Sequence, residues 1–494
     1  MPAEIPDPAA AASAAARLLP PLAPLAGRGW VVGGGLRDAL LGVPVADVDL
    51  AVVGDAAEAA RTLARAHGAA RFRLSADFGA WRVHGGRLPF VVDLTPLQGG
   101  SLEADLARRD VTVNALALPL DGSGGVIDPY GGMEDLRRRR LRLVRPSALR
   151  DDPVRVLRLA RLGRQLGFAI DAEARVRARE AAADLGRSAP ERQMDELRRI
   201  LRQPEPWRGI ELLDELGALG ALVPELEQAR GLEQNAYHHR DVLGHVLEVV
   251  RRAGEIAADP EPVFRALAPR VAARLMEPLA DEMTRGRALL LGALLHDVAK
   301  PATRMVTPEG RIGFPRHDEV GAAMADAWCR RMRTSTRLRE FVVLLVRRHL
   351  PLGFLVHRAP LSLREIDRYL RSTAPAEIEV IVLSVADRLA TRGPRTSDSA
   401  ILRHLALARE VLRVHLELVD RGPIRPLVNG AELARELGRP VGPWLRPLLD
   451  ALREEQLVGR VRDREGALRF ARSWHERHSS STGTVPMSTA GSGA

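Results

Sequence analysis

The sequence predicts an α+β protein in which a small mixed-sheet head precedes an all-helical neck, body and tail. Residues 27–145 alternate short apolar strand patterns with helix patterns, whereas beyond residue 146 the apolar spacing is helical almost throughout. With 494 residues the chain is too long for one ordinary core, so we expect three or more domains. Prolines at 204–206 and 260–262, and the pair Gly393-Pro394, divide the helical part into blocks.

These signals predict six segments. The first, residues 1–26, is rich in alanine and proline and predicts a short helix and a linker. The last, residues 479–494, is rich in serine, threonine and glycine and predicts disorder. Between them we expect the head at 27–145, the neck at 146–225, the body at 226–400 and the helical tail at 401–478.

Composition narrows the class of protein and its partners. A net charge of +10 with 46% hydrophobic residues indicates a globular protein with a polyanionic partner. No apolar run is long enough to span a membrane, and prolines interrupt the N-terminus where a signal peptide has its apolar core. We therefore expect a cytoplasmic protein without a membrane partner. Cys329 is the only cysteine, which excludes an internal disulfide, and the oligomeric state stays open.

The head opens with a strand–turn–helix–strand pattern over residues 27–50. Three glycines centred on Gly34 allow a turn whose N–H groups can face a phosphate, and Arg37 stands where it can reach the same anion. Asp47 and Asp49 follow on the second strand. Because side chains two apart share one face of a strand, these carboxylates beside a phosphate-binding turn predict a Mg²⁺ site.

Further strand and helix signals complete the head. We expect a helix over 56–67, then strands in FRLSADF, WRVHG and PFVVDLT, and a helix LEADLARRD running into an apolar strand VTVNALAL. Asp93 is another carboxylate, which we interpret as the end of its strand rather than a metal ligand. Arg108 and Arg109 could clamp a triphosphate, but taken alone they favour a solvated helix end.

The neck begins with a helix start and a stripe of arginines. Asp151 or Asp152 can cap this helix, and Pro153 suits its first position. Arginines then recur at steps of three on one face, at Arg155, Arg158, Arg161 and Arg164. Their mutual repulsion requires either a bound anion, which would make the stripe a cradle for phosphate and base, or acidic neighbours from elsewhere in the chain.

These motifs, in this order, resemble those of the class II tRNA nucleotidyltransferases and bacterial poly(A) polymerases. GGGLRD with DVD resembles the family's first motif, followed by RRDVTVNALAL, IDPYGGMEDL, the base-template motif DDPVRVLRLAR and the neck-helix motif ERQMDEL. The resemblance implies a nucleotidyltransferase head with Asp47 and Asp49 as catalytic Mg²⁺ ligands, and tRNA, CTP and ATP as partners. It implies nucleotide contacts from Gly34, Arg37, Arg109, Asp152, Arg155, Arg158 and Arg161.

Base chemistry agrees with the template assignment. The Asp152 carboxylate can accept from the amino group of cytosine or adenine but would face an acceptor oxygen on uracil or guanine, while Arg155 can donate to ring acceptors. A mispaired base leaves a polar group unmet at a cost of ~1–3 kcal/mol. One departure concerns the connection Leu94–Gly100, which is shorter than in members that add the whole CCA. That shortness resembles the CC-adding branch.

The body carries a second constellation. His245, His296-Asp297 and Asp387 lie on successive helical segments, and imidazole and carboxylate are ligands of divalent metals. They resemble the HD phosphohydrolase domain of some bacterial tRNA nucleotidyltransferases, which implies a divalent metal of open identity. His317 and His349 match extra ligands in metal-rich HD domains and leave room for two ions. Lys300, the only lysine, stands where it could meet a phosphate.

We therefore predict a template-independent nucleotidyltransferase that adds C and/or A from CTP and ATP to tRNA 3′ ends, as CCA or as CC only. Its HD domain would be a phosphohydrolase, and its last helices resemble the tail that holds the tRNA elbow. The alternatives are a poly(A) polymerase of the same superfamily, an HD phosphohydrolase with an RNA-binding head, and a non-catalytic RNA-binding protein. Intact Asp47 and Asp49 argue against the last two.

Overall fold

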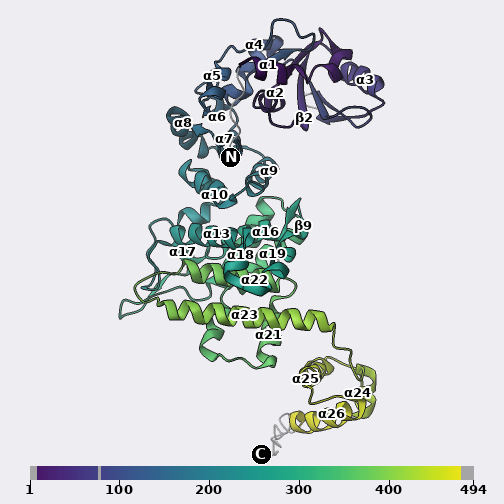
Figure 1. Ribbon diagram of the computed structural model, residues 1–494. Coiled ribbons are helices and arrows are strands. Elements are labelled where there is room, and N and C mark those ends of the chain that lie inside the picture. Colours follow the sequence, from purple (N-terminus) through teal and green to yellow (C-terminus); the bar gives the residue numbers. More distant parts are fainter. Residues whose placement is uncertain (1–7, 76–78, 480–494) are drawn as a thin grey trace, which may run out of the picture.

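The computed structural model describes residues 8–75 and 79–479. The molecule is elongated, and the head, neck, body and tail follow one another from one end to the other (Figure 1). A six-stranded mixed sheet lies in the head, and helices dominate the rest, so the predicted α+β class is confirmed. The disorder predicted for the last segment falls almost wholly outside the described residues. No helix in the described ranges is long and apolar enough to cross a membrane.

The head sheet brings strands from distant parts of the segment together. In spatial order its strands are β3 (Ala70–Ser75), β4 (Ala80–His84), β5 (Val91–Pro96), β2 (Asp47–Val52), β1 (Gly29–Val32) and β6 (Ala117–Pro119). Only β2 and β5 pair in parallel. Helices α2 (Gly33–Leu40), α3 (Ala56–His67) and α4 (Leu102–Ala107) connect them, and α3 has the predicted bounds.

Two parts of the head differ from the expectations. The segment VTVNALAL is not one strand: Thr112–Asn114 form a 3-10 turn and only Ala117–Pro119 pair with β1. The turn forms because Asp110 accepts hydrogen bonds from the Val111 N–H and the Asn114 side chain. The N-terminal segment forms the predicted short helix, α1 (Pro8–Ala16), but part of the predicted linker is a 3-10 helix, Pro20–Leu25, and Ala15, Leu22 and Leu25 are buried in the head core.

The neck joins the head through a short parallel pair, β7 (Arg140–Leu141) with β8 (Ala169–Ile170). A short helix, α5 (Gly132–Arg137), precedes this pair. The neck helices are α6 (Ala148–Asp151), α7 (Arg155–Leu166), α8 (Ala172–Ala182), α9 (Pro190–Leu201), α10 (Pro206–Glu215), α11 (Ala218–Leu222) and α12 (Pro224–Glu227). Helix α7 packs its apolar face, including Val156 and Leu159, into the core and lies beside α9.

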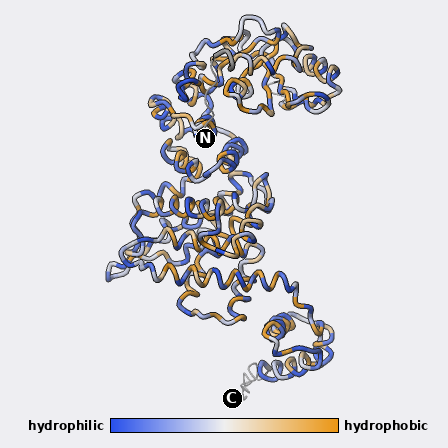
Figure 2. The backbone as a smooth tube through the Cα atoms, in the orientation of Figure 1, coloured by the Kyte–Doolittle hydropathy of each residue, from blue (hydrophilic) through white to orange (hydrophobic). Residues whose placement is uncertain are grey.

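The body is built around α16 (Arg285–Leu295), whose residues from Ala288 onward are all buried, as expected for a helix that is apolar all round. Figure 2 shows the hydrophobic segments gathered inside the body. Its other helices are α13 (Val242–Ala258), α14 (Glu261–Phe264), α15 (Ala268–Met276), α17 (Lys300–Thr303), α18 (His317–Arg331), α19 (Thr336–Arg348), α20 (Pro351–Leu355), α21 (Leu363–Thr373), α22 (Glu377–Ala390) and α23 (Asp398–Arg421). Two short hairpins, β9 (Pro278–Ala280) with β10 (Met283–Thr284) and β11 (Met305–Val306) with β12 (Ile312–Gly313), complete it.

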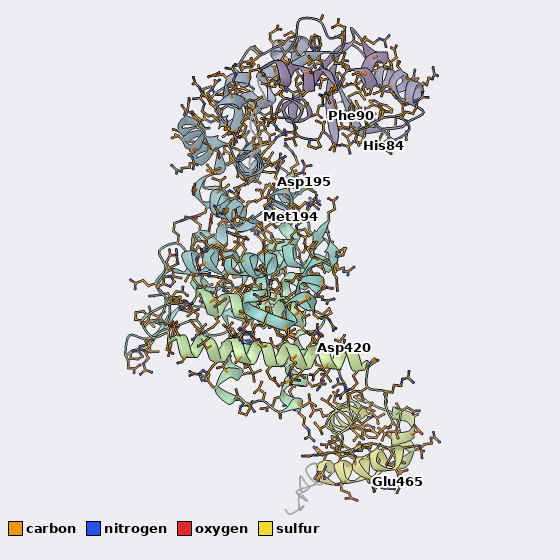
Figure 3. All side chains as sticks on the ribbon, in the orientation of Figure 1. His84, Phe90, Met194, Asp195, Asp420 and Glu465 are labelled. Carbon is orange, nitrogen blue, oxygen red and sulfur yellow. The ribbon has the colours of Figure 1, made fainter. Side chains whose placement is uncertain are left out.

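The tail has a core of its own. Helices α24 (Gly430–Glu436), α25 (Leu445–Leu457) and α26 (Arg464–Ser479) bury Leu433, Leu448 and Ala467 against one another. It meets the body where α21 faces α25 through ion pairs, among them Arg364 Nη2–Glu455 Oε1 at 2.6 Å and Arg453 Nη1–Asp367 Oδ2 at 2.7 Å. Figure 3 labels one residue of the body and one of the tail: Asp420 near the end of α23, and Glu465 in α26.

Candidate functional site

The two predicted metal ligands lie on one face of β2. Asp47 and Asp49 are exposed, whereas the alternating Val48 and Leu50 are buried in the core. The parallel register places Asp93 of β5 directly beside Asp49. Strand β5 continues to Pro96, so the interpretation of Asp93 as a strand end is wrong.

The carboxylates on this face form a crowded group. Desolvation by surrounding atoms raises the pKa of Asp49, and the charges of Asp93 and Asp47 add to that rise, while Arg109 and Arg158 oppose it. The donor set suits a divalent cation, since a cation relieves the repulsion between neighbouring carboxylates. Asp93 is itself held by two bonds from Arg82, with Nε to Oδ1 and Nη2 to Oδ2 both at 2.7 Å.

Glycines bring α2 into close contact with these carboxylates. Gly33 has a φ of +77°, and a Cβ there would lie 2.9 Å from both Asp49 Oδ2 and Arg109 Nη1. A Cβ at Gly35 would lie 2.5 Å from the backbone oxygen of Asp47. A Cβ at Gly34 would make only ordinary van der Waals contacts. The lack of space for a side chain therefore applies to its neighbours Gly33 and Gly35.

The two head arginines predicted to bind nucleotide occupy different environments. Arg37 is 4% exposed. It donates to Asn114 Oδ1 at 2.6 Å and to Asp38 Oδ1 at 2.8 Å, so its guanidinium supports the turn at the start of α2. Arg109 donates to Asp105 at 3.1 Å and lines a cavity of about 320 Å³ together with Asp49.

Side chains from the neck enter the same cavity. Arg155 and Arg158 of α7 line it together with Asp49. The Nε of Arg158 lies 2.6 Å from Oδ2 of buried Asp110. Burial would raise the pKa of Asp110, but Arg158 and the hydrogen bonds from Asn114 and Val111 lower it to about 2. Asp110 therefore stays ionised and fixes the start of α7 against the head.

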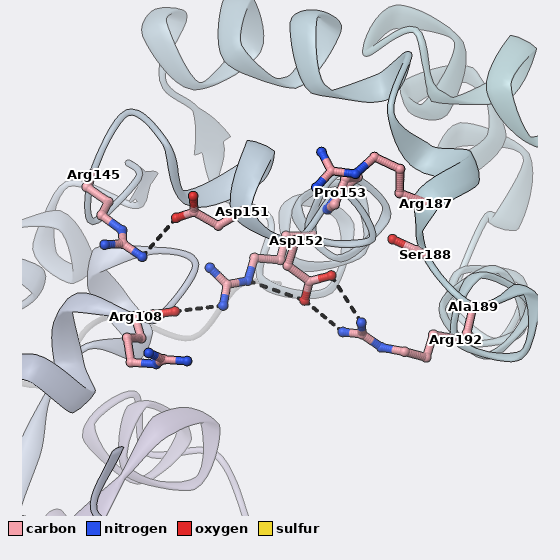
Figure 4. A pocket seen from close by; sticks show the side chains of 10 residues that line it. Arg108, Arg145, Asp151, Asp152, Pro153, Arg187, Ser188, Ala189 and Arg192 are labelled. Carbon is pink, nitrogen blue, oxygen red and sulfur yellow. Dashed lines mark hydrogen bonds and ion pairs between the residues drawn. The ribbon is translucent and has the colours of Figure 1, made fainter. Parts of the chain in front are cut away.

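Asp152 lies in an adjoining cavity of about 720 Å³, which we call the template cavity. Figure 4 shows Asp152 facing Arg192 of α9, whose Nη2 and Nη1 donate to its two carboxylate oxygens at 2.7 and 3.1 Å. The Nε of Arg155 lies 3.6 Å from Asp152 Oδ2. A further cavity of about 510 Å³ is lined by Asp152, Arg155 and Arg158, so Arg155 and Arg158 line both the cavity at Asp49 and the one at Asp152.

The predicted helix cap at Asp151 or Asp152 is wrong. Helix α7 starts at Arg155 after Val154 and has no side-chain cap. Asp152 has an extended backbone, with φ −147° and ψ 92°, because the following Pro153 disfavours the helical conformation. Asp151 pairs instead with Arg145 at 2.8 Å. The Asp152 side chain is thus free of a capping role.

The arginine stripe has acidic partners along its length. Arg161, 9% exposed, pairs with Glu196 Oε2 at 2.6 Å, and Arg164 pairs with Glu205 at 3.4 Å. The alternative with acidic neighbours therefore holds for these two, and only Arg155 and Arg158 reach the cavities. Arg192 lies in the motif ERQMDEL, but no signal in the sequence predicted that it binds Asp152.

The predicted metal ligands of the body lie close together. His245 Nε2 lies 3.0 Å from Asp387 Oδ1, and His296 Nε2 lies 3.1 Å from Asp297 Oδ2. His317 Nε2 lies 3.3 Å from Asp297 Oδ1. Two sets of ligand atoms are each close enough to share an ion: His245 with His296 and Asp387, and Asp297 with His317 and His349. We call these six residues the HD cluster.

Hydrogen bonds fix the imidazoles of the HD cluster for metal binding. The Nδ1 atoms of His296, His317 and His349 lie 2.7–2.8 Å from backbone oxygens, which leaves each Nε2 as a lone-pair donor. Those three Nε2 atoms are buried without a hydrogen-bond partner among the described residues. Burial and, to a smaller extent, the charge of His296 lower the pKa of His349 to about 4. The cluster fits one or two divalent ions.

The ammonium group of Lys300, which the sequence suggested as a phosphate contact, is bound to other side chains of the protein. Its Nζ lies 2.6 Å from Asp297 Oδ2 and donates to Gln234 Oε1 at 2.7 Å. The residue is buried, so the contact with Asp297 balances the charge of that carboxylate. His238 also adjoins the cluster, with its ring 4.7 Å from that of His245 in a T-shaped contact.

Comparison with known proteins agrees with this architecture. The family model of the poly(A) polymerase head domain matches residues 29–142, that of a probable RNA- and SrmB-binding site of polymerase A matches residues 167–230, and that of the HD domain matches residues 242–392. An A-adding tRNA nucleotidyltransferase from Deinococcus radiodurans is 36% identical over 93% of this chain and 98% of its own length. A CC-adding tRNA nucleotidyltransferase from Thermus thermophilus is 36% identical over 92% of this chain and 95% of its own.

A solved structure shows the same fold. A CCA-adding enzyme in complex with ATP matches with a TM-score of 0.62 over 90% of this chain and 91% of that chain, at 19% identity. The head, neck, body and tail therefore follow an arrangement already known. Together with the two relatives that match almost end to end, these findings show that the chain belongs to the tRNA nucleotidyltransferase family, with a poly(A) polymerase-type head joined to an HD domain.

Proposed function

We propose that this protein is a template-independent nucleotidyltransferase that adds C and/or A from CTP and ATP to the 3′ end of tRNA in the cytoplasm. The observation that carries the proposal is the pair Arg155 and Arg158, which line both the cavity at Asp49 and the cavity at Asp152. The names of the two relatives supply the substrate. In the reaction the 3′ hydroxyl oxygen bonds to the α-phosphorus of the nucleotide, the bond to the β-phosphate oxygen breaks, and pyrophosphate and a proton leave.

The head residues would divide this task. Asp47 and Asp49 would hold Mg²⁺, which supplies charge neutralisation at the phosphates and acidifies the attacking hydroxyl. Gly34, in the turn at the start of α2, would present a backbone N–H to the triphosphate. Arg109 would add positive charge from the facing wall, and Arg37 would keep the turn in place through its contact with Asn114.

The template cavity would choose the base. Arg192 holds the Asp152 carboxylate by two hydrogen bonds, so one orientation of its acceptor oxygens is fixed before a nucleotide enters. An amino group of cytosine or adenine would then find an acceptor, and Arg155 would donate to the base from the other side. Arg158 would neutralise the phosphates, and Arg161 would support α7 through Glu196.

The HD cluster supports a second activity, hydrolysis of a phosphate ester. Its six residues would hold one or two divalent ions, which supply Lewis acidity and lower the pKa of a bound water. Four imidazoles favour a transition metal such as Mn²⁺, Fe²⁺ or Zn²⁺ over Mg²⁺. In the reaction the ester P–O bond breaks, water gives its OH to phosphorus and the second proton to the leaving alcohol.

The experiment that tests the main proposal uses tRNA transcripts ending before the first C, before the second C and before A. Each is incubated with each nucleotide singly and in pairs, and product lengths are read. Addition of C or A, but not U or G, is expected. Long A tracts on any RNA would instead favour the poly(A) polymerase. No incorporation with phosphatase activity retained would favour an HD phosphohydrolase.

A narrower specificity, C addition with poor addition of terminal A, is favoured by the connection between β5 and α4. Leu97 N–H donates to Val52 O at 3.0 Å, and Gln98 N–H donates to Asp105 Oδ1 at 3.2 Å. The Ser101 hydroxyl accepts from Ala104 N–H and caps α4. The segment is therefore pinned and offers no lever that could shift the template from cytosine to the larger adenine. Efficient single-A addition to tRNA ending in CC would refute this specificity.

A further inference from the structure

A cavity of about 530 Å³ opens onto the HD cluster from the side of α22 and α23. His349 and Asp387 belong both to its wall and to the cluster. We call it the HD cavity, and its volume lies in the range of small-molecule sites. Besides these two metal-ligand candidates, its lining includes three arginines and three large apolar or aromatic side chains: Arg388, Arg395, Arg403, Tyr237, Leu350 and Phe354.

The three arginines of the HD cavity have one acidic residue beside them in the lining, Asp387, whose charge acts on Arg388. Within residues 8–75 and 79–479, Arg388, Arg395 and Arg403 form no ion pair, and the Nε of Arg388 is buried without a hydrogen-bond partner. The stripe on α7 is different, because there each arginine faces a carboxylate. Asp387, the acidic residue in the lining, already faces His245 at 3.0 Å. Cations gathered without acidic partners are typical of an anion-binding site.

Backbone hydrogen bonds fix one part of the wall of the HD cavity. Gly393 N–H donates to Tyr237 O at 2.6 Å, and Arg395 N–H donates to Ala236 O at 3.1 Å. A Cβ at Gly393 would lie 2.3 Å from the carbonyl carbon of Tyr237, so glycine permits this close approach. The contact holds Arg395 and Tyr237 together in the lining of the cavity.

Aromatic surface lies beside the cations. Tyr237 is 47% exposed and Phe354 is 67% exposed, and both line the HD cavity. Exposed aromatic rings next to arginines are a common platform for nucleobases, because each ring can stack on a base while the cations bind phosphate. The wall thus offers complementary contacts for two parts of one ligand.

We propose that the HD cavity takes a phosphate ester of a nucleoside that carries a second phosphate. The reacting phosphate would lie at His349 and Asp387, the second phosphate at Arg388, Arg395 and Arg403, and the base against Tyr237 or Phe354. This inference rests on the proposed hydrolytic function of the HD domain and adds its substrate class. The second phosphate can belong to a nucleoside bisphosphate or be the next phosphodiester linkage of an RNA chain. Both ligands present a nucleoside that carries two phosphate groups.

The test compares four substrates with the full-length protein: p-nitrophenyl phosphate, adenosine 3′-monophosphate, adenosine 3′,5′-bisphosphate and an oligoribonucleotide ending in a 3′-phosphate. Each is assayed with Mg²⁺, Mn²⁺, Co²⁺, Ni²⁺ and Zn²⁺ in turn. A lost charge-assisted contact is worth about tenfold or more, so we expect kcat/KM for the bisphosphate to exceed that for the monophosphate by about tenfold. If the oligoribonucleotide exceeds the bisphosphate, the second phosphate comes from RNA.

The variant Arg395→Ala/Arg403→Ala should remove this preference by raising KM for the bisphosphate toward that for adenosine 3′-monophosphate. Both side chains are exposed, so the fold should tolerate their loss. Arg392→Ala is the matched control, because Arg392 is a neighbouring exposed arginine that pairs with Asp398 at 3.0 Å and does not line the HD cavity.

The outcomes separate the two proposals. Hydrolysis of p-nitrophenyl phosphate without preference for a second phosphate, or equal loss on all four substrates in the double variant, would overturn this inference alone. No hydrolysis of any ester by the unaltered protein with any of the metals would overturn the HD function and this inference together.

Discussion

The substitution Gly33→Ala tests whether the first turn of α2 must leave room for the catalytic groups. It adds one methyl group, whose carbon would lie 2.9 Å from Asp49 Oδ2 and from Arg109 Nη1. Relaxed contacts need about 3.5 Å, so both side-chain ends must withdraw by roughly half an ångström. Both atoms are the ends of side chains, so the clash should cost little stability. They are also the groups proposed to hold Mg²⁺ and the triphosphate, so the clash should cost activity.

A matched control separates this clash from backbone strain. Gly33 and Gly42 have similar positive φ values, +77° and +70°, but a Cβ at Gly42 meets nothing within 4 Å. An alanine in the left-handed region costs about 1–2 kcal/mol, so both variants should lose similar stability. Hydrogen exchange of the β1 and β2 amides would measure that loss within the head.

The activity assay is addition of C to tRNA under saturating CTP, with Mg²⁺ titrated. Misplacing a catalytic group by part of an ångström to one ångström costs on the order of 100-fold, so Gly33→Ala should fall by about that factor below Gly42→Ala. A Mg²⁺ requirement shifted upward in Gly33→Ala alone would agree with a displaced Asp49. If the two variants add C at rates within about threefold of each other, the reasoning about room at Gly33 is refuted.

Four further outcomes follow from the same geometry. Asp49→Ala should reduce nucleotide addition about a thousandfold (~4 kcal/mol) with the fold retained, and near-normal addition would contradict its role as a metal ligand. Asp152→Ala should relax discrimination against UTP and GTP by about 10-fold or more, whereas equal weakening of all four nucleotides would make the residue structural. His296→Ala and Asp297→Ala should abolish metal-dependent phosphatase activity and keep nucleotide addition, and joint loss in folded protein would argue against separate sites. Asp110 has its pKa lowered to about 2 in the folded protein, so its stabilising contribution is present above about pH 4 and is lost as the pH falls toward 2. Between about pH 4 and pH 2 the free energy of unfolding of the head should therefore fall less in Asp110→Asn than in the unaltered protein, by up to about 2 kcal/mol. Identical dependence on pH in the two proteins would contradict the assignment.

The sequence was informative where the relevant spacing is short. Asp47 and Asp49 share a face because strand geometry alone requires it, and α3 has its predicted bounds because its cap, apolar spacing and terminal Gly68 are all local signals. The HD cluster could be predicted as a set of residue types, although the lone pairs on its Nε2 atoms depend on backbone oxygens that only the fold places.

Predictions failed where a long-range partner decides the outcome. The arginines of α7 left two interpretations open, an anion cradle or acidic neighbours, because Glu196 and Glu205 lie 35 and 41 residues away along the chain and become neighbours only after α9 and α10 fold back. Asp152 was expected to cap a helix, and its pairing with Arg192 spans 40 residues. Lys300 suggested a phosphate contact because nothing in the sequence shows that its ammonium reaches Asp297 and Gln234.

The junction between α21 and α25 gives the molecule a joint whose stiffness depends on salt. In the part of the chain that the structure describes, the buried clusters of body and tail do not merge, and charged pairs such as Arg364–Glu455 hold the two together. Ion pairs that solvent can reach, such as Arg364–Glu455, contribute about 0–1 kcal/mol each and weaken as ionic strength rises, whereas the pair of Arg453 with buried Asp367 is screened less. The tail should therefore be fixed at low ionic strength and compliant at high ionic strength, without either part unfolding. The reach between the tail and Asp49 then becomes a range rather than a fixed length, and its width depends on the surrounding salt.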